Sequence, residues 1–458
     1  MLDVNQNIDL ARGKIAPTYA RILVPTFFGM LSTALFLLTD GIFVGHGIGS
    51  DALAAVNIVQ PVFTVATAIG MMFAVGASVV AAVDMSHGEN DAAGMAVTRA
   101  FSAVLFLGVI LGVVLYLFPN QILVLLGSSD VLMPLCREYY LWFIPTVLFT
   151  MLQLCGQFVI RLDGSPVFSS LMEIVPAVVN IFLDWLFIFP MDMGLAGAAL
   201  ATSIGGIVGV GMAAWYMVFK AEKLSFTGLK TAFLESKEAF GSIAHMAGLG
   251  ASAFLGEFAV SVQVLAGNYM FMKVLGEDGV AAYSVTCYLV PIFFMACMAM
   301  SQSAQPLISF NYGAGKMDRV WETFRISTVL AAVFGLAVTL IFIIFPDAMV
   351  AVFINRASPA FRMCSEGLPY YSLGFVFMNC CVSVVGFFQS IERSRTATVL
   401  TLLRGMVFPV AAIVGLPAIL GSLGLWLSMP VSETVSLLFI ALPAMVKYGR
   451  GEYEPENK

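Results

Sequence analysis

The chain has 458 residues, of which 60% are hydrophobic and only 11% are charged, and its formal net charge is −6. A soluble globular protein carries about 25% charged residues, so this composition indicates a polytopic membrane protein. The sequence has no basic patch and no Cys/His spacing typical of zinc, which argues against nucleic-acid binding and against a zinc protein.

Twelve apolar stretches are long enough to cross a bilayer, which takes about 20 helical residues. They cover residues 20–44, 52–82, 96–118, 134–160, 166–189, 195–219, 241–272, 280–308, 322–345, 367–390, 396–420 and 424–446. A segment in lipid must satisfy its own backbone hydrogen bonds, so each stretch is expected to be an α-helix. An even number of spans puts both termini on the same side of the membrane.

The distribution of Lys and Arg indicates which side this is. With a cytoplasmic N-terminus, 17 of the 22 basic residues fall in cytoplasmic segments, four fall in outer loops and one, Arg404, lies within a span. The positive-inside rule therefore places both termini in the cytoplasm.

The chain also repeats itself with an offset of 227 residues. Phe118-Pro119 closes the third span and Phe345-Pro346 closes the ninth, and the glycines at 194 and 421 precede the sixth and twelfth spans. We therefore expect two pseudo-symmetric six-helix bundles of the same orientation. Transporters built from such repeats commonly place the substrate site between the two halves.

The repeat sets the expected domain organisation. The predicted parts are an N-terminal lobe at 1–219, a cytoplasmic linker at 220–240, a C-terminal lobe at 241–446 and a cytoplasmic tail at 447–458.

Two acidic residues lie inside apolar stretches, Asp184 in the fifth span and Asp40 near the end of the first. A carboxylate in hydrocarbon costs at least a few kcal/mol, so such residues usually face a polar cavity and serve a function. At about 1.5 Å per helical residue, both acids lie at a depth similar to that of Asn180 and Thr202. Oxygen ligands of these types suit a hard cation such as Na⁺, and two neighbouring acids can share a proton.

The alternative is that Asp40 caps a helix end and Asp184 pairs locally with a polar neighbour. The repeat argues against it, because the positions that match these acids in the second half are Gly267 and Ala411. An architectural role would be expected in both halves. We therefore predict a cation-coupling site confined to the N-terminal lobe.

Other charged residues within spans allow more than one interpretation. Glu257, midway along the seventh span, either attracts a cationic substrate or makes a structural hydrogen bond. Arg404 and Glu433 lie at similar depth in consecutive spans, so we predict a structural ion pair. Glu173, about two turns into the fifth span, could line a vestibule on the cytoplasmic side.

The chain has 26 Met and 38 Phe residues, and several cluster in the eighth span around Met295 and Met298. Flexible, polarizable side chains suit a promiscuous site for flat apolar molecules. Most Met side chains must nevertheless contact lipid or the core, and we predict a substrate role only for Met295 and Met298.

These features resemble the multidrug and toxic compound extrusion (MATE) family of the wider flippase superfamily, over nearly the whole chain. The resemblance rests on Thr39–Gly45 followed by Leu53–Ala55, on Asn180–Asp184, and on the specific run Gln305–Ala314 after the eighth span. It implies a V-shaped transporter whose lobes rock between inward-facing and outward-facing states.

The resemblance also implies residue roles. In related proteins an Asp of helix 1, an Asn and an Asp of helix 5 and a Thr of helix 6 line a cation site, and these match Asp40, Asn180, Asp184 and Thr202. Some relatives use an acid in helix 7, for which Glu257 is the candidate. Members coupled through the C-terminal lobe have an Asp in helix 10, whereas span 10 here offers only Glu366 at its outer edge.

We therefore expect a prokaryotic inner-membrane antiporter, not an enzyme, that acts as a monomer and needs no cofactor. It would export organic, often cationic and aromatic, compounds against entering H⁺ or Na⁺, since both ions use the same oxygen ligands. The alternative is a lipid-linked oligosaccharide flippase of the same superfamily, which should have a more basic cavity than this sequence provides. A membrane enzyme would need clustered catalytic or metal-binding motifs near an interface, and none is visible.

Overall fold

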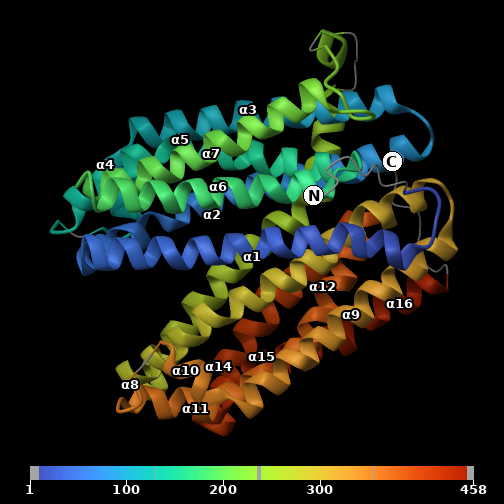
Figure 1. The fold of residues 1–458 in the computed structure, drawn as a ribbon. Helices are drawn as coiled ribbons and strands as arrows, with labels where there is room; N and C mark the ends of the chain where they lie inside the picture. Colours follow the sequence, from blue (N-terminus) through green and yellow to red (C-terminus); the bar gives the residue numbers. More distant parts are fainter. Residues whose placement is uncertain (1–9, 129, 229, 235–238, 354, 451–458) are drawn as a thin grey trace. The chain divides into compact units, whose positions relative to one another are not determined.

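The computed structural model describes residues 10–128, 130–228, 230–234, 239–353 and 355–450. Within these ranges the chain is almost entirely helical, as Figure 1 shows, so the prediction of an all-α protein is confirmed. The predicted tail lies outside the described residues from 451 onward, and so do residues 229 and 235–238 of the predicted linker.

The helices fall into two series along the chain. The first series is α1 (Ile15–Gly47), α2 (Ser50–Ser86), α3 (Asn90–Leu117), α4 (Pro119–Leu125), α5 (Met133–Leu162), α6 (Pro166–Ile188), α7 (Gly194–Phe219) and the π-helical turn η1 (Lys230–Leu234). The second is α8 (Ala239–Gly313), α9 (Met317–Ile344), α10 (Pro346–Ala351), α11 (Pro359–Ser372), α12 (Phe375–Ser390), α13 (Ser394–Leu402), η2 (Leu403–Val407), α14 (Phe408–Leu420), α15 (Ser422–Ser436), η3 (Leu437–Ala441) and α16 (Leu442–Gly449).

The described residues contain ten continuous helical stretches that are long and apolar enough to cross a membrane. One of them, α8, has 75 residues, or roughly 110 Å at 1.5 Å per residue, which is far more than a bilayer needs. Its backbone breaks at Gly276, where φ is 73°, so α8 supplies two spans. The pair α11 and α12, bent by 47°, supplies one more. The total is twelve, as predicted.

The internal repeat is visible in the helix bounds. Both α3 and α9 have 28 residues, and both their first and last residues differ by 227 (317 minus 90 and 344 minus 117). The Phe that follows each helix has nearly the same backbone conformation, with φ of −122° at Phe118 and −124° at Phe345, and each is followed by a short helix that begins with Pro. The two halves therefore use the same local structure at matching positions.

The chain divides into two compact units. The first unit consists of Met1–Phe254 and Ser309–Lys316, and the second consists of Leu255–Ile308 and Met317–Lys458. Each unit has its own apolar core, which includes Tyr140 and Met151 in the first and Phe271, Phe342 and Phe375 in the second. These units differ from the lobes drawn from the repeat, because both ends of α8 belong to the first unit. The predicted lobe boundaries remain a prediction.

Two glycines explain why the start of α8 packs with the first unit. A Cβ atom on Gly76 of α2 would overlap the backbone of Met246, and a Cβ atom on Gly250 of α8 would overlap the carbonyl group of Met72. The two helices cross backbone to backbone at these positions. Such crossings need small residues, because membrane helices associate chiefly through close van der Waals packing.

The part of the predicted linker that follows α7 is also fixed on the first unit. The Asp163 carboxylate accepts hydrogen bonds from the backbone N–H groups of Lys223 (2.9 Å) and Leu224 (3.0 Å). Farther along, the buried Arg99 of α3 donates to the carbonyl oxygen of Ala232 at 3.0 Å. These contacts tie both the start and the π-helical turn of the linker to helices of one unit.

Candidate functional site

Helices α1 and α6 hold the predicted acidic site in the first unit, where they lie side by side and run in the same direction (Figure 1). Midway along α1, Gly29 contacts Glu173 in the first half of α6, and at the ends of both helices Gly47 contacts Ile188. The rings of Phe43 and Phe189 also meet at the far end, with centroids 5.8 Å apart. This parallel packing brings Asp40 and Asp184 to the same level.

The carboxyl groups of Asp40 and Asp184 lie close enough to interact directly. Asp184 is fully buried and Asp40 is half-buried. Two ionised carboxylates have only acceptor atoms, so a hydrogen bond between them requires a proton on one of the two. The pair can therefore hold one proton, or its oxygens can face a cation together.

Asn180 and Thr202 complete the predicted set. Asn180, one turn before Asp184 on α6, donates from Nδ2 to Oγ1 of Thr202 on α7 at 3.3 Å. The Thr202 hydroxyl in turn donates to the carbonyl oxygen of Ala198 at 3.1 Å. This chain of hydrogen bonds uses the amide nitrogen of Asn180, and its Oδ1 has no hydrogen-bond partner in the described part of the chain.

Three oxygen atoms of this cluster have no hydrogen-bond partner among the described residues. They are both carboxylate oxygens of Asp184 and Oδ1 of Asn180, and all three are buried. Buried polar atoms without partners are rare in native structures and call for an explanation such as an ion. Carboxylate, amide and hydroxyl oxygens are the donor types that a Na⁺ ion prefers, so the cluster fits this ion as well as a proton.

Tyr139 of α5 was not predicted to belong to the site. Its side chain is buried, and its ring stacks on that of Phe143 with the centroids 5.2 Å apart. It lies within electrostatic range of both Asp40 and Asp184. Nothing in its sequence context distinguishes it from other aromatic residues of α5. Only the packing of α5 in the first unit brings it to the acids.

The predicted substrate residues Glu257, Met295 and Met298 lie in the second unit, on α8. All three are half-buried. Met298 packs against the apolar core of the second unit, as an ordinary core residue would, whereas Met295 is not part of that set. Their role in binding substrate remains a prediction.

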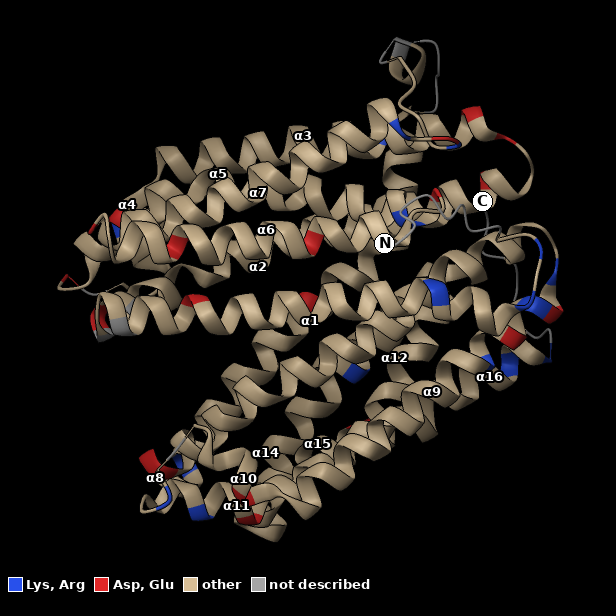
Figure 2. Ribbon diagram, in the orientation of Figure 1, with Lys and Arg blue, Asp and Glu red and all other residues tan. Residues whose placement is uncertain are grey.

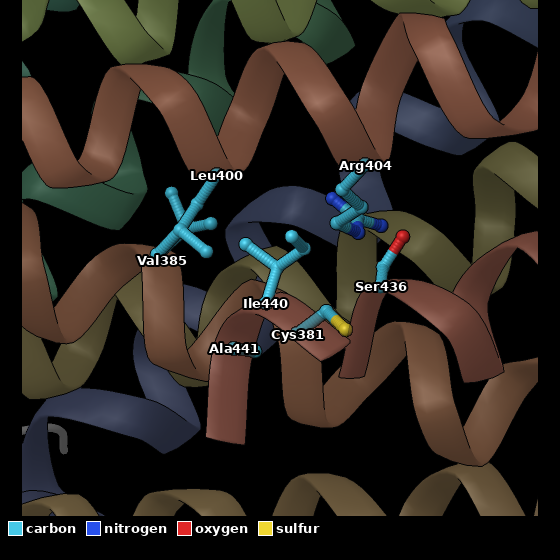
Figure 3. A pocket seen from close by; sticks show the side chains of 7 residues that line it. All are labelled: Cys381, Val385, Leu400, Arg404, Ser436, Ile440 and Ala441. Atoms are coloured by element: carbon cyan, nitrogen blue, oxygen red, sulfur yellow. The ribbon is translucent and has the colours of Figure 1, made fainter. Parts of the chain in front are cut away.

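The predicted contact between Arg404 and Glu433 is present in the second unit. Nε of Arg404, in η2, donates to Oε2 of Glu433, in α15, at 3.0 Å, and the two side chains are 15% and 6% exposed. Arg404 also lines a small pocket with Ser436 and Cys381, and Figure 3 shows these three polar groups at one end of it. The π-helical turn directs the Gly405 carbonyl oxygen to Nε2 of Gln263 at 2.7 Å.

We expect that breaking this ion pair from one side will destabilise the protein. Arg404→Met or Glu433→Gln alone should lower the free energy of unfolding by about 3–5 kcal/mol, because the remaining charge is left buried. The double variant should cost less than the sum of the two single changes. Thermal unfolding in detergent compares the two single variants and the double variant with the unmodified protein. A loss of stability in the double variant equal to the sum of the two single losses would contradict a direct ion pair.

Charged residues within the helices are few. Figure 2 shows acidic positions along α6 and on α1, whereas most other charged positions lie in loops and at helix ends. A duplicated helical bundle with twelve spans and a buried acidic cluster is typical of a polytopic membrane transporter.

Comparison with known proteins identifies the family. The sequence model of the MatE family matches residues 25–186 and 253–413, which is most of the chain, so the protein belongs to the MatE family of MATE efflux transporters. The family resemblance noted in the sequence is therefore confirmed.

Related proteins and solved structures agree with this assignment. The multidrug export protein MepA of Staphylococcus haemolyticus is 25% identical over 423 residues, covering 90% of this chain and 89% of that protein. MepA of Staphylococcus aureus strain NCTC 8325 is 24% identical over 428 residues, covering 91% of this chain and 90% of that protein.

Two solved structures show the same fold. A multidrug resistance MATE family transporter of the MOP superfamily in an outward-facing conformation superimposes with a TM-score of 0.90 at 21% identity, covering 97% of this chain and 98% of that chain. A MOP superfamily transporter from Pyrococcus furiosus gives a TM-score of 0.90 at 20% identity, covering 98% of this chain and 99% of that chain. The predicted twelve-helix fold is thereby confirmed.

Proposed function

We propose that this protein exports organic, often cationic and aromatic, compounds in exchange for an entering cation that binds at Asp40, Asn180, Asp184 and Thr202. The observation that carries the proposal is the set of three buried oxygens of Asp184 and Asn180 without hydrogen-bond partners in the described part of the chain. Leaving such an atom unsatisfied costs about 1–3 kcal/mol. A cation at this point would recover that energy.

The coupling ion is H⁺ or Na⁺. A proton would be held between the carboxyl groups of Asp40 and Asp184, which then form a hydrogen bond. A Na⁺ ion would instead be held by the carboxylate oxygens, the amide oxygen of Asn180 and the hydroxyl oxygen of Thr202. Either ion neutralises a buried charge and so favours one arrangement of the helices around it.

Exchange requires that cation and substrate stabilise different states of the protein. A ligand shifts a conformational equilibrium only by its difference in affinity for the two states. In the mechanism proposed here, the cation entering from outside favours the state from which substrate has left, and substrate favours the state from which the cation has left. Glu257 and Met295 are the proposed substrate contacts, since a carboxylate attracts an organic cation and a Met side chain adapts to flat apolar rings.

The buried basic residues support an exporter rather than a lipid-linked oligosaccharide flippase. A flippase must hold a pyrophosphate, for which Arg is the preferred ligand. Here Arg404 is paired with Glu433, and the buried Arg161 interacts electrostatically with Glu173. The guanidinium groups of Arg404 and Arg161 are therefore balanced by carboxylates of the same chain, and the buried Arg99 donates to the carbonyl oxygen of Ala232 at 3.0 Å.

The bacterial relatives named multidrug export protein support the export activity that we propose. The protein would act as a monomer in the cytoplasmic membrane of a prokaryotic cell. Both termini would lie in the cytoplasm, in line with the 17 of 22 basic residues assigned to that side.

Efflux from sealed vesicles tests the proposal. The reconstituted protein should move a fluorescent organic cation such as ethidium against its own gradient when an inward cation gradient is imposed. A pH gradient and a Na⁺ gradient are applied one at a time, and one of the two should drive transport. Dye accumulation that depends on neither the pH gradient nor the Na⁺ gradient would contradict cation exchange.

A further inference from the structure

A third acidic residue, Glu173, lies on the same face of α6 as the proposed cation site. It precedes Asp184 by 11 residues and Asn180 by seven, which correspond to about three and two helical turns. All three side chains are buried. The face of α6 that carries the cation site therefore also carries Glu173, roughly 16 Å nearer the start of the helix, with Pro176 and Ala177 buried between Glu173 and Asn180.

Helix α1 packs against α6 at both Glu173 and Asp184. Gly29 of α1 contacts Glu173, and Asp40 of α1 faces Asp184; the residue offset is 144 in both pairs (173 minus 29 and 184 minus 40). Because both pairs join the same two parallel helices, Glu173 and Asp184 lie in one α1–α6 interface. At Gly29 the Glu173 carboxyl group occupies the space that a Cβ atom would fill.

The surroundings of Glu173 differ from those of the hydrogen-bonded Arg404–Glu433 pair. Its side chain is about nine-tenths buried, and Oε2 has no hydrogen-bond partner within the described ranges. The charged group that faces it is the guanidinium of Arg161 on α5, which interacts with it electrostatically and lies 5.2 Å from the centre of the Phe158 ring. Arg161 can balance an ionised Glu173 while a carboxylate oxygen stays available for another ligand.

We propose that Glu173 is a second binding station for the coupling cation, on a path along the α1–α6 interface that begins at Asp184. This inference rests on the proposed function. The two carboxylates are too far apart to share one ion, so the cation occupies them in turn, with the Asn180 amide between them. The chemistry of the station, a buried carboxylate oxygen, suits H⁺ and Na⁺ alike.

The test uses the full chain in sealed proteoliposomes with ethidium as the probe. Uphill efflux is driven by an imposed pH gradient or, separately, by a Na⁺ gradient, and downhill exchange is driven by the dye gradient alone. In Glu173→Gln the uphill rate should fall roughly 5- to 150-fold, while the downhill rate stays within about twofold of the unmodified protein. Glu173→Asp, which keeps a carboxylate, should recover part of the uphill rate.

Two further variants make the comparison specific. Glu138→Gln makes the same change at an exposed carboxylate of the first unit, where Oε1 accepts a hydrogen bond from the backbone of Ala196, and should transport normally. Gly29→Ala keeps Glu173 but displaces its carboxyl group, and should also lower the uphill rate selectively. This variant keeps the inference testable if Glu173→Gln does not fold.

Several results would overturn the inference. One is an equal fall of uphill and downhill rates in Glu173→Gln and Gly29→Ala, which indicates a structural role. Another is a change only in the KM for ethidium, which indicates a substrate contact, and a third is unchanged uphill transport. In each case an inactive Asp184→Asn variant would leave the proposed function standing, whereas normal uphill efflux by Asp184→Asn would remove the proposed function itself.

Discussion

Replacing Asp184 by Asn should abolish efflux against a gradient while the protein stays folded and inserted. Asn has nearly the same shape but cannot carry a negative charge, so the cluster loses the group that neutralises a cation. Coupling free energies are typically 1–3 kcal/mol, and their loss should lower the ratio of dye concentrations across the membrane by roughly 5- to 150-fold. Dye accumulation in cells that express the variant measures this ratio.

A matched variant shows whether an Asp→Asn change outside the proposed site affects efflux. Asp192, in the loop after α6, is exposed and has a φ of 48°, a conformation that Asn accommodates well. Asp192→Asn should therefore keep full efflux and full stability. Wild-type dye export by Asp184→Asn, at equal expression, would refute the assignment of the coupling site.

Replacing Gly250 by Ala should destabilise the first unit. In a helix interior Ala is favoured over Gly by about 0.5–1 kcal/mol, so propensity alone predicts a small gain. The added Cβ atom, however, overlaps the backbone carbonyl of Met72, which cannot move without separating α2 from α8. Such overpacking typically costs about 1–3 kcal/mol, so the net effect should be a loss.

Gly248, two residues earlier on the same helix, is the control for this prediction. A Cβ atom there meets nothing within 4 Å, so Gly248→Ala should be neutral or slightly stabilising. Thermal unfolding in detergent compares the two variants directly. Equal stability of both would show that α2 and α8 do not cross at this point.

Much of the fold could be predicted because membrane spans have a strong signal. A span needs about 20 apolar residues, and hydrocarbon leaves a helix as the structure that satisfies the backbone. The offset of 227 residues, seen first in Phe118-Pro119 and Phe345-Pro346, reappears in the bounds of α3 and α9. Local signals of this kind do not depend on how distant helices pack.

The site could be predicted in part, because similar depth and the family resemblance group Asp40 and Thr202 with the two residues of α6. Asn180 and Asp184 are one turn apart, so helical periodicity places them together without knowledge of the fold. Tyr139 and the orientation of Glu173 depend on which faces of α5, α6 and α1 meet, and a single sequence does not contain that information. The close crossing at Gly76 and Gly250 was missed for the same reason, since a Gly in a span has several explanations.

The most direct test of the cation-coupled exchange is cation release by the purified protein on addition of substrate. Ethidium is added in weakly buffered detergent solution, and a pH indicator or a Na⁺-selective electrode follows the ion that is set free. The wild-type protein should release one of the two ions in proportion to protein, and Asp184→Asn should release neither. Equal release by both proteins, or none by the wild type in the presence of bound dye, would contradict coupling at Asp184.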